Sequence, residues 1–337
     1  MPSLNPELNT SAIWSTRKER HNMPLLTIAI PTFNKASYLE GCLKSLKDAL
    51  PENENDIEIL IINNNSSDKT ESIINTVSDE ITLRYIKNQT NIGSNKNFKK
   101  CVTEAKGRFV WIFKDDNIFF KYSIKSILHT LKHNKNIGLL NLKIKSFQKN
   151  EDILGFEPNK HQYNLFDSKE KFIKKIHTNI TSLSANIFNK TFLKENDIDK
   201  IPNNRLGQVY WNMLAVIKTQ QSISCDTPTF GDRRSVGDNF CEVFADSFIN
   251  ILNSMNKKHN IARFINIFYA RLLIFYYPIN IIKFKNKLSN TKQNSNNCFS
   301  VLYSKFKFNI YFWIFTVPAI VLPKKAGLYI IKKIKNY

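Results

Sequence analysis

The stretch GRFVWIFKDDNIFF, residues 107–120, ends an apolar run with two adjacent carboxylates. The run Phe109–Phe113 predicts a buried β-strand, and Asp115 and Asp116 follow it closely. Neighbouring like charges repel and raise one another's pKa, so the pair needs compensation. The stretch therefore predicts a cation between the carboxylates and a ligand, with a pair that only caps the next turn as the alternative.

Three further apolar runs precede this stretch, and a segment with helical spacing of its apolar residues follows each of them. The alternation of strand and helix predicts an α/β domain with a mostly parallel sheet. One of these helices should begin at Asp68, because Asp68 and Glu71 have the spacing of a capping box. The apolar runs are Leu25–Ile30, Ile57–Ile62 and Leu83–Lys87.

The ends of the predicted strands indicate where a ligand binds. Thr32–Asn34 follow the first strand, Asn63–Asn65 the second and Asp115–Asn117 the fourth. In parallel sheets, ligands bind at the carboxyl ends of the strands. These three segments are therefore expected to line one cleft.

Beyond residue 120 the pattern is less regular. The polar stretch 225–239 is expected to be a connection, and the chain beyond Lys257 is expected to be largely helical. The other elements predicted here are helices over 122–133, 169–176, 207–219 and 239–255 and strands over 137–147 and 180–188.

Three motifs together carry a resemblance to a known family. TIAIPTFNKASYLEGCLKSL, IEILIINNNSSDKT and NIGSNKNFKKCVTEAKGRFVWIFKDDN follow one another from residue 27 to 117. Their order and spacing resemble family 2 glycosyltransferases, in particular bacterial enzymes of O-antigen, capsule and lipooligosaccharide synthesis. SLSANIFNKTFL and GQVYWNMLA extend the resemblance more weakly. It implies a GT-A fold (a Rossmann-like, mostly parallel sheet), a nucleotide-diphospho-sugar donor, a hydroxyl acceptor on a surface glycan or lipid-linked oligosaccharide, and inversion at the anomeric carbon.

The resemblance also assigns roles to the residues of the cleft. Asp116 resembles the ligand of a divalent metal, Mg²⁺ or Mn²⁺, that bridges the donor phosphates, and Asp115 would support it or contact the ribose. Oxygen ligands from one or two carboxylates plus phosphates suit these ions. Thr32, Phe33 and Asn34 resemble the segment beneath the nucleotide, although Phe33 alone is also compatible with core packing.

Two more positions match donor-binding residues of the family. Asn64 resembles the residue that reads the base edge, where many members have Asp, and its amide has both a donor and an acceptor. Lys96 resembles a basic residue that faces the diphosphate, with an exposed helix-face lysine as the alternative.

The general base is the main departure from the family. Many inverting members have Asp at the start of the helix that begins here with Gly207 and Gln208, and an amide cannot take a proton from the acceptor. The carboxylates of the next polar stretch are candidates, with Asp232 favoured over Asp226 and Asp238. A catalytically degenerate scaffold or binding protein at the membrane surface is the alternative function. A nucleotidyltransferase is disfavoured, because no glycine-rich phosphate loop follows the first strand.

Charge divides the chain unequally. Residues 247–337 contain fifteen Lys or Arg and no Asp or Glu, which is most of the net charge of +21. The run Ile310–Leu322, with lysines on both sides, predicts an interfacial anchor on anionic lipid. Packing of these helices on the transferase domain is the alternative, and no nucleic-acid-binding motif is present. No run reaches the roughly 18 apolar residues of a membrane-spanning helix.

These patterns predict three parts and a location. Residues 1–24 form an N-terminal tail without the apolar segment of a signal peptide, 25–235 the transferase domain (donor half 25–120, acceptor half 121–235), and 236–337 a basic membrane-associating region. The five cysteines show no metal spacing, so reduced thiols are expected. The protein is expected to be cytoplasmic and peripheral on the inner face of the plasma membrane.

Overall fold

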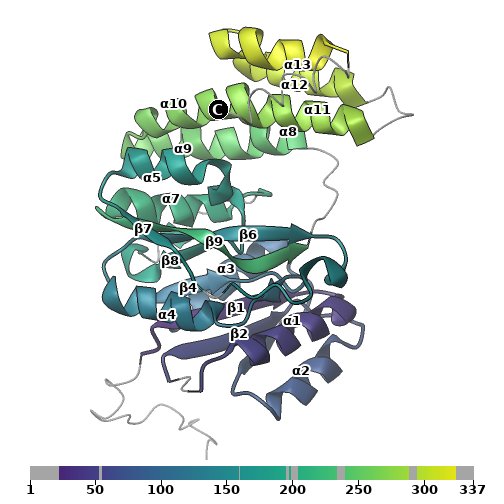
Figure 1. Ribbon diagram of the computed structural model, residues 1–337, viewed down its shortest axis with the longest axis vertical. Coiled ribbons are helices and arrows are strands. Elements are labelled where there is room, and N and C mark those ends of the chain that lie inside the picture. Colours follow the sequence, from purple (N-terminus) through teal and green to yellow (C-terminus); the bar gives the residue numbers. More distant parts are fainter. Residues whose placement is uncertain are drawn as a thin grey trace, which may run out of the picture.

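The computed structural model describes residues 23–52, 55–158, 160–194, 197–198, 204–233, 240–287 and 294–323. A large twisted sheet with helices on both faces is followed by a stack of helices that continues the long axis of the molecule (Figure 1). Of the expected N-terminal tail, only residues 23 and 24 lie within these ranges.

The sheet confirms the predicted α/β class. In the described residues it has nine strands, in the order β3-β2-β1-β4-β8-β6-β9-β5, with β7 paired to β9. The part β3-β2-β1-β4 is parallel throughout, and the second half is mixed. The strands are β1 (Leu26–Thr32), β2 (Ile57–Asn63), β3 (Arg84–Lys87), β4 (Phe109–Ile112), β5 (Ile118–Phe119), β6 (Leu139–Phe147), β7 (Tyr163–Phe166), β8 (Asn186–Asn189) and β9 (Ser222–Arg233).

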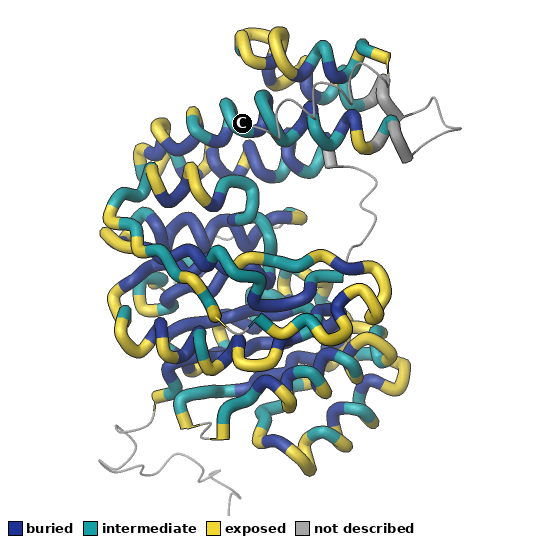
Figure 2. Tube along the Cα trace, in the orientation of Figure 1, coloured by how far each residue is buried: buried dark blue, intermediate teal, exposed yellow. Residues whose placement is uncertain are grey.

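Helices cover the sheet on both faces because its central strands are apolar on both sides. In β1, Ile28 and Ile30 join one core cluster, whereas Ala29 joins the other. The first cluster lies under α1 (Ala36–Ala49), α2 (Thr70–Ser78) and α4 (Ser123–His133). The second lies under α3 (Ser94–Glu104), α5 (Lys169–Ile176) and α7 (Gln208–Lys218). The resulting buried interior is visible in Figure 2.

Several local predictions were wrong. Lys69, not Asp68, precedes the first turn of α2, and Glu71 pairs with Lys87 (2.7 Å) rather than reaching back to form a capping box. The segment expected to be a strand over 180–188 begins instead with the end of a 3-10 helix, η3 (His177–Thr181), and only Asn186–Asn189 form β8. Two further 3-10 turns are η2 (Asn150–Ile153) and η4 (Lys190–Phe192).

The predicted polar connection is mostly a strand. β9 runs over Ser222–Arg233 although it contains Pro228, which cannot donate a hydrogen bond to a neighbouring strand. The register between β6 and β9 shifts at this point, next to the pair Lys143 and Pro228. Such an irregularity accommodates the missing donor and lets the strand continue.

The C-terminal helices share one apolar interior with the sheet. Buried residues from α3 and α7 belong to the same cluster as Phe248, Phe268 and Phe312. The elements are α8 (Phe240–Glu242), η5 (Val243–Phe248), α9 (Ile249–His259), α10 (Ala262–Arg271), η6 (Leu272–Tyr276), α11 (Tyr277–Lys287), α12 (Asn294–Phe306), η7 (Phe312–Thr316) and α13 (Val317–Val321), where η5, η6 and η7 are π-helical turns.

One continuous helix corrects the expectation that no segment is long enough to span a membrane. Ala262–Lys283, with 22 residues, passes by length and composition alone, and 44% of its most apolar window is buried inside the fold. The π-helical turn η6 lies within it. Partial burial of this kind is also what the core helix of a soluble domain shows.

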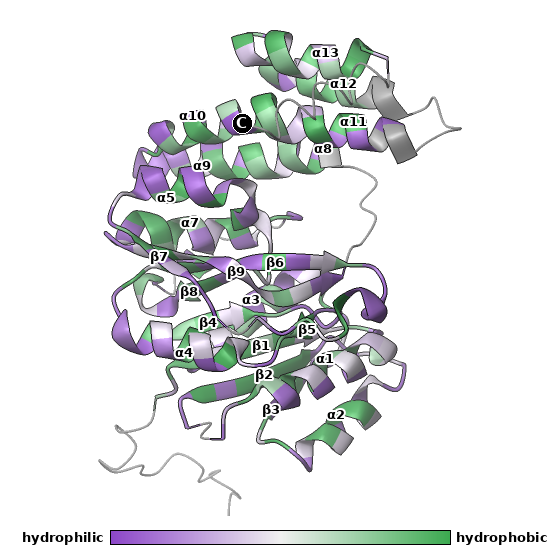
Figure 3. Ribbon diagram, in the orientation of Figure 1, coloured by the Kyte–Doolittle hydropathy of each residue, from purple (hydrophilic) through white to green (hydrophobic). Residues whose placement is uncertain are grey.

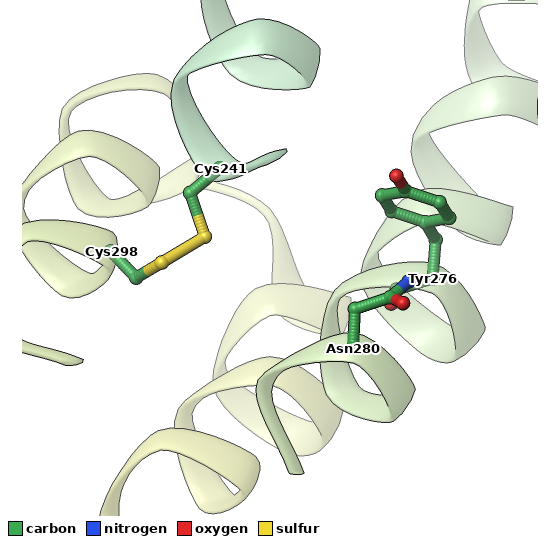
Figure 4. The surroundings of a disulfide bond; sticks show 4 residues. All are labelled: Cys241, Tyr276, Asn280 and Cys298. Carbon is green, nitrogen blue, oxygen red and sulfur yellow. A yellow bond between two sulfur atoms is a disulfide. The ribbon is translucent and has the colours of Figure 1, made fainter. Parts of the chain in front are cut away.

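The expectation of reduced thiols was wrong for two of the five cysteines. Cys241 and Cys298 form a disulfide between α8 and α12, although they lie 57 positions apart in the sequence (Figure 4). Cys42, Cys101 and Cys225 are free and buried.

Candidate active site

The carboxyl ends of β1, β2 and β4 meet at one edge of the sheet. Asn64 N donates to Thr32 O at 2.9 Å, and Phe113 N donates to Ala29 O at 2.8 Å. Asp115 and Asp116 follow β4 at this edge and are almost fully buried. The parallel sheet thus brings together segments far apart in the sequence.

Asp116 lies between two lysine side chains. Lys35 Nζ donates to Asp116 Oδ2 at 2.8 Å and lies 3.9 Å from Asp115 Oδ1. Lys114 Nζ lies 3.3 Å from Asp116 Oδ1. Each oxygen of this buried carboxylate therefore faces an ammonium group, and a buried charge needs such a partner.

β9, the last described strand along the chain, adds a third carboxylate to this group. Lys114 Nζ donates to Asp232 Oδ1 at 3.0 Å, so this one lysine joins Asp116 and Asp232. The pairing of Ile118 with Gly231 brings the end of β9 beside the acidic pair. We name these five residues, Lys35, Lys114, Asp115, Asp116 and Asp232, the carboxylate–lysine cluster.

The neighbouring carboxylates have pKa values shifted in opposite directions. Burial raises the pKa of Asp115 to about 6, against the lowering effects of Lys35 and the Thr32 hydroxyl. Burial also acts to raise the pKa of Asp116, but Lys114 and Lys35 outweigh it and hold this pKa below its ordinary value. Asp116 therefore keeps its negative charge more firmly and is the better ligand for a cation.

Asn34 joins two loops at the edge of the cleft. Its backbone is left-handed (φ 50°), its N–H donates to Ser66 Oγ at 2.9 Å, and its Oδ1 accepts from Ser67 N at 2.8 Å. Phe33 beside it is 40% exposed, so it does not belong to the core. An exposed ring next to a fixed loop fits the expected position beneath a nucleotide.

Asn64 is part of a buried amide network. Its Oδ1 accepts from Asn88 Nδ2 at 2.9 Å and from Ile92 N at 3.0 Å, and its Nδ2 donates to Asn91 Oδ1 at 2.7 Å. These bonds fix the loop before α3, so base reading by Asn64 would have to use the remaining amide N–H. Lys96 is exposed in the first turns of α3.

The structure separates the candidates for the general base. Asp226 and Asp232 lie on the same strand but six residues apart, which is roughly 20 Å at the rise of a β-strand. Asp226 accepts from Asn164 Nδ2 at 2.9 Å and pairs with Lys175 at 2.8 Å, away from the acidic pair. The expectation that this stretch is a connection gave no means of telling the two aspartates apart. Asp238 lies outside the described residues.

Gln208 is the first residue of α7, as the resemblance implied. It is buried, and its Nε2 donates to Thr181 O at 2.7 Å. This bond ties the start of α7 to the end of η3. The amide has no basic group for the acceptor proton, so its role in the fold is to hold these two segments together.

Lys35 and Lys114 were missed by the sequence reasoning. Their only signal was that each directly neighbours a motif residue, Lys35 after Asn34 and Lys114 before Asp115. Lysine is common throughout this chain, so adjacency alone could not distinguish them. The ion pairs follow from the strand order, which places β1, β4 and β9 at one edge.

The donor set fits a metal ion that takes part of its ligands from a phosphate. In the ranges described, no group of three or more His, Cys, Asp or Glu could hold a metal by itself. One or two carboxylates plus substrate phosphates are, however, a common way to hold Mg²⁺. Asp116 Oδ1 is buried without a well-formed hydrogen bond and lies 3.3 Å from Lys114 Nζ, so it could serve as a ligand atom where a metal ion takes the place of that ammonium group.

Solved structures share this fold. S. aureus TarS in complex with UDP-GlcNAc matches with a TM-score of 0.59 and 18% identity over 83% of this chain and 81% of that one. A mannosyltransferase, PcManGT from Pyrobaculum calidifontis in complex with GDP-Man and Mn²⁺, matches with a TM-score of 0.55 and 10% identity over 92% of this chain and 89% of that one. The fold is therefore of the GT-A type.

The sequence comparisons identify the family. The family model "Glycosyl transferase family 2" matches residues 27–196, half of the chain, and the chain belongs to this family. Abequosyltransferase RfbV of Salmonella typhimurium is 37% identical over 108 residues, 32% of each chain. The GalNAc(5)-diNAcBac-PP-undecaprenol beta-1,3-glucosyltransferase of Campylobacter jejuni is 32% identical over 108 residues, 32% of this chain and 34% of the relative. These matches span about a third of the curated relatives.

Proposed function

We propose that the protein is a glycosyltransferase that moves a sugar from a nucleotide-diphospho-sugar to a hydroxyl group of a surface glycan or lipid-linked oligosaccharide, with inversion at the anomeric carbon. The carboxylate–lysine cluster at the carboxyl edge of β1, β4 and β9 carries this proposal. It lies where open α/β sheets bind ligands, in a chain that belongs to glycosyl transferase family 2.

The relatives support the two substrate classes. TarS and PcManGT are described in complex with nucleotide sugars, and the Campylobacter jejuni relative is named for an undecaprenol-linked acceptor. The donor would lie over Thr32, Phe33 and Asn34, with its base toward Asn64. Lys96, exposed on α3, would face the diphosphate from the other side.

A divalent cation, Mg²⁺ or Mn²⁺, would be held by Asp116 with support from Asp115. When bound, it would neutralise charge on the diphosphate leaving group. Asp116 suits this role because its pKa is lowered by Lys114 and Lys35 despite burial, so it stays anionic. Asp115 would orient the donor.

Asp232 is the proposed general base. Its carboxylate lies at the same edge as Asp116, held by Lys114 Nζ at 3.0 Å, and its side chain is 25% exposed. A partly exposed carboxylate at this edge can take the proton of an acceptor hydroxyl that approaches the anomeric carbon from the side opposite the leaving group. Asp226 lacks this placement, and Gln208 lacks the chemistry.

Peripheral association with the inner face of the plasma membrane is the second part of the proposal. In the segment 303–321, Phe312 and Thr316 are buried against the other helices, whereas a set of apolar residues is exposed. Figure 2 shows exposed and buried residues alternating along this segment, and Figure 3 colours much of it as hydrophobic. We call this set the aromatic patch: Tyr303, Phe308, Ile310, Tyr311, Trp313, Ile314, Phe315 and Val321.

The charge of this region matches the proposed lipid surface. The fifteen Lys and Arg residues from 257 to 335 have no acidic residue among them, and anionic lipid attracts such residues by about 1 kcal/mol each near the surface. The segment is compatible with both of the sequence-based alternatives, since one face packs on the fold and the other is exposed and apolar.

The test is a screen of the purified protein against nucleotide sugars, with released nucleoside diphosphate as the readout, in Mg²⁺, in Mn²⁺ and in EDTA. Release from one donor that depends on metal supports the proposal. A catalytically degenerate membrane-surface scaffold is the second candidate, favoured by Gln208 at the usual position of the base. Nucleotide binding without any turnover, with membrane extracts as the acceptor source, would favour this second candidate.

A further inference from the structure

Both oxygens of Asp116 are occupied by lysines of the same chain. Lys35 Nζ is 2.8 Å from Oδ2 and Lys114 Nζ is 3.3 Å from Oδ1. A metal ion that binds Asp116 must therefore replace at least one ammonium group. The lysine side chains are 40% and 30% exposed, and the flexible stem of lysine allows the ammonium group to move.

The charges of the carboxylate–lysine cluster oppose a metal ion that arrives alone. Three carboxylates and two ammonium groups leave a net charge of −1. A divalent cation by itself would make the cluster positive while two ammonium groups remain within a few ångströms of it. A cation that arrives with a diphosphate brings its own negative charge, which also gives the displaced lysines a new partner.

Each lysine has a second carboxylate that keeps it in place after the exchange. Lys114 donates to Asp232 at 3.0 Å, and Lys35 lies 3.9 Å from Asp115. Loss of the contact to Asp116 therefore does not release either ammonium group from the site. Lysines held at this edge would be available to pair with diphosphate oxygens.

We infer that Lys35 and Lys114 act as internal cations that close Asp116 to a free metal ion, so that the metal binds only together with a nucleoside diphosphate group. This inference rests on the proposed function, since it concerns the same donor site. It assigns the two lysines a positioning role: they pair with Asp116 before the donor arrives and transfer to the diphosphate when donor and metal bind.

The test is Mn²⁺ binding to the full-length protein by isothermal titration calorimetry, alone and with UDP, GDP, CDP or dTDP. In the wild type, one of these nucleotides should tighten Mn²⁺ binding at least about tenfold. In Lys35→Met and Lys114→Met, Mn²⁺ alone should bind about tenfold more tightly than in the wild type, because a nearby positive charge is gone. The effect of the nucleotide on Mn²⁺ binding should shrink accordingly.

Lys44→Met is the matched control, because Lys44 is an exposed lysine of α1 and its loss lowers the net charge equally. Equal Mn²⁺ affinity in Lys44→Met and in both site variants would overturn the inference. It would also be overturned if no nucleotide tightened Mn²⁺ binding to the wild type and the lysine variants bound Mn²⁺ no more tightly than the wild type. Circular dichroism of each variant establishes folding, and the wild-type comparison stands without any variant. If the protein bound none of the four nucleotides, this result would contradict the proposed function instead. The effect of the lysine variants on the binding of Mn²⁺ alone would still decide this inference.

Discussion

The edge of the sheet and the C-terminal helices treat positive charge in opposite ways. At the edge, Lys35 and Lys114 each face two carboxylates within 4 Å. Across residues 247–337, fifteen Lys and Arg have no acidic residue in their own segment, and Lys305 reaches back to Asp246 at 3.0 Å for a partner. Charge balanced inside the fold supports the proposal of a site for a small ligand, whereas unbalanced charge beside exposed aromatics supports the proposal of a surface that meets an external anion.

Asp116→Asn is the change that should affect the edge most and the helices least. Loss of the anionic ligand should lower transfer on the order of 10³-fold, since metal stabilisation of the leaving group is worth several kcal/mol. Binding to liposomes should stay unchanged, because the aromatic patch lies in the other region. Full activity of this variant, or of the wild type in excess EDTA, would contradict the metal role of Asp116.

Removal of the disulfide should weaken the helical region. Cys298→Ser should lower the free energy of unfolding by about 2–4 kcal/mol, because the bond closes a loop of 57 residues in the unfolded chain. Chemical denaturation with and without a reducing agent is the measurement, and the reducing agent should destabilise the wild type but not the variant. Equal stability of the two proteins, or two free thiols at these positions under non-reducing conditions, would contradict the bond.

Asp115 should make the free energy of unfolding depend on pH. Burial raises its pKa in the folded state to about 6, from 3.8. The folded carboxyl therefore holds its proton more tightly than the unfolded one, so its contribution to stability is complete at low pH and is lost as the pH rises through about 6. Between about pH 4 and about pH 7, the wild type should lose up to about 3 kcal/mol relative to Asp115→Asn. A difference in stability between the two proteins that stays constant with pH would contradict the raised pKa of Asp115.

Two exposed apolar residues, one from each region, test whether the aromatic patch binds membranes or is exposed without such a function. Phe308 in the aromatic patch is 95% exposed, and Leu154 after η2 is 85% exposed. Phe308→Ser should weaken flotation with anionic liposomes about tenfold, since burial of such a side chain is worth 1.5–3 kcal/mol. Leu154→Ser should have no effect. Equal flotation of the two variants, or flotation of the wild type that does not change with the anionic lipid content, would contradict the proposed role of the aromatic patch.

The sequence predicted the parallel half of the fold well because its strands are continuous apolar runs. Leu26–Thr32 and Ile57–Asn63 have few polar interruptions, and their ends show where the edge lies. β9 was not predicted because Pro228 and its aspartates resemble a loop, and only the register shift against β6 makes it a strand. The roles of Lys35 and Lys114 could not be predicted either, since their ion pairs depend on strand order rather than on local sequence.

The two aspartates of β9 also show why position in the chain alone does not distinguish candidates for the general base. Asp226 and Asp232 have the same chemistry and lie in the same polar stretch, yet the strand separates them by roughly 20 Å. Asp232 pairs with Lys114 of the cluster, and Asp226 pairs with Lys175 of α5. Extended backbone converts a short sequence separation into a long distance.

The central claim is that the ends of β4 and β9 together form the reacting centre, and transfer rates of three variants test it most directly. Asp232→Ala should lower transfer on the order of 10²-fold or more, as loss of a general base does. Asp226→Ala should stay near the wild-type rate, and Gln208→Ala should lower it only modestly. Each protein is compared at equal nucleotide sugar and acceptor, after circular dichroism has established its fold. A wild-type rate for Asp232→Ala, or a larger loss for Asp226→Ala, would contradict the claim.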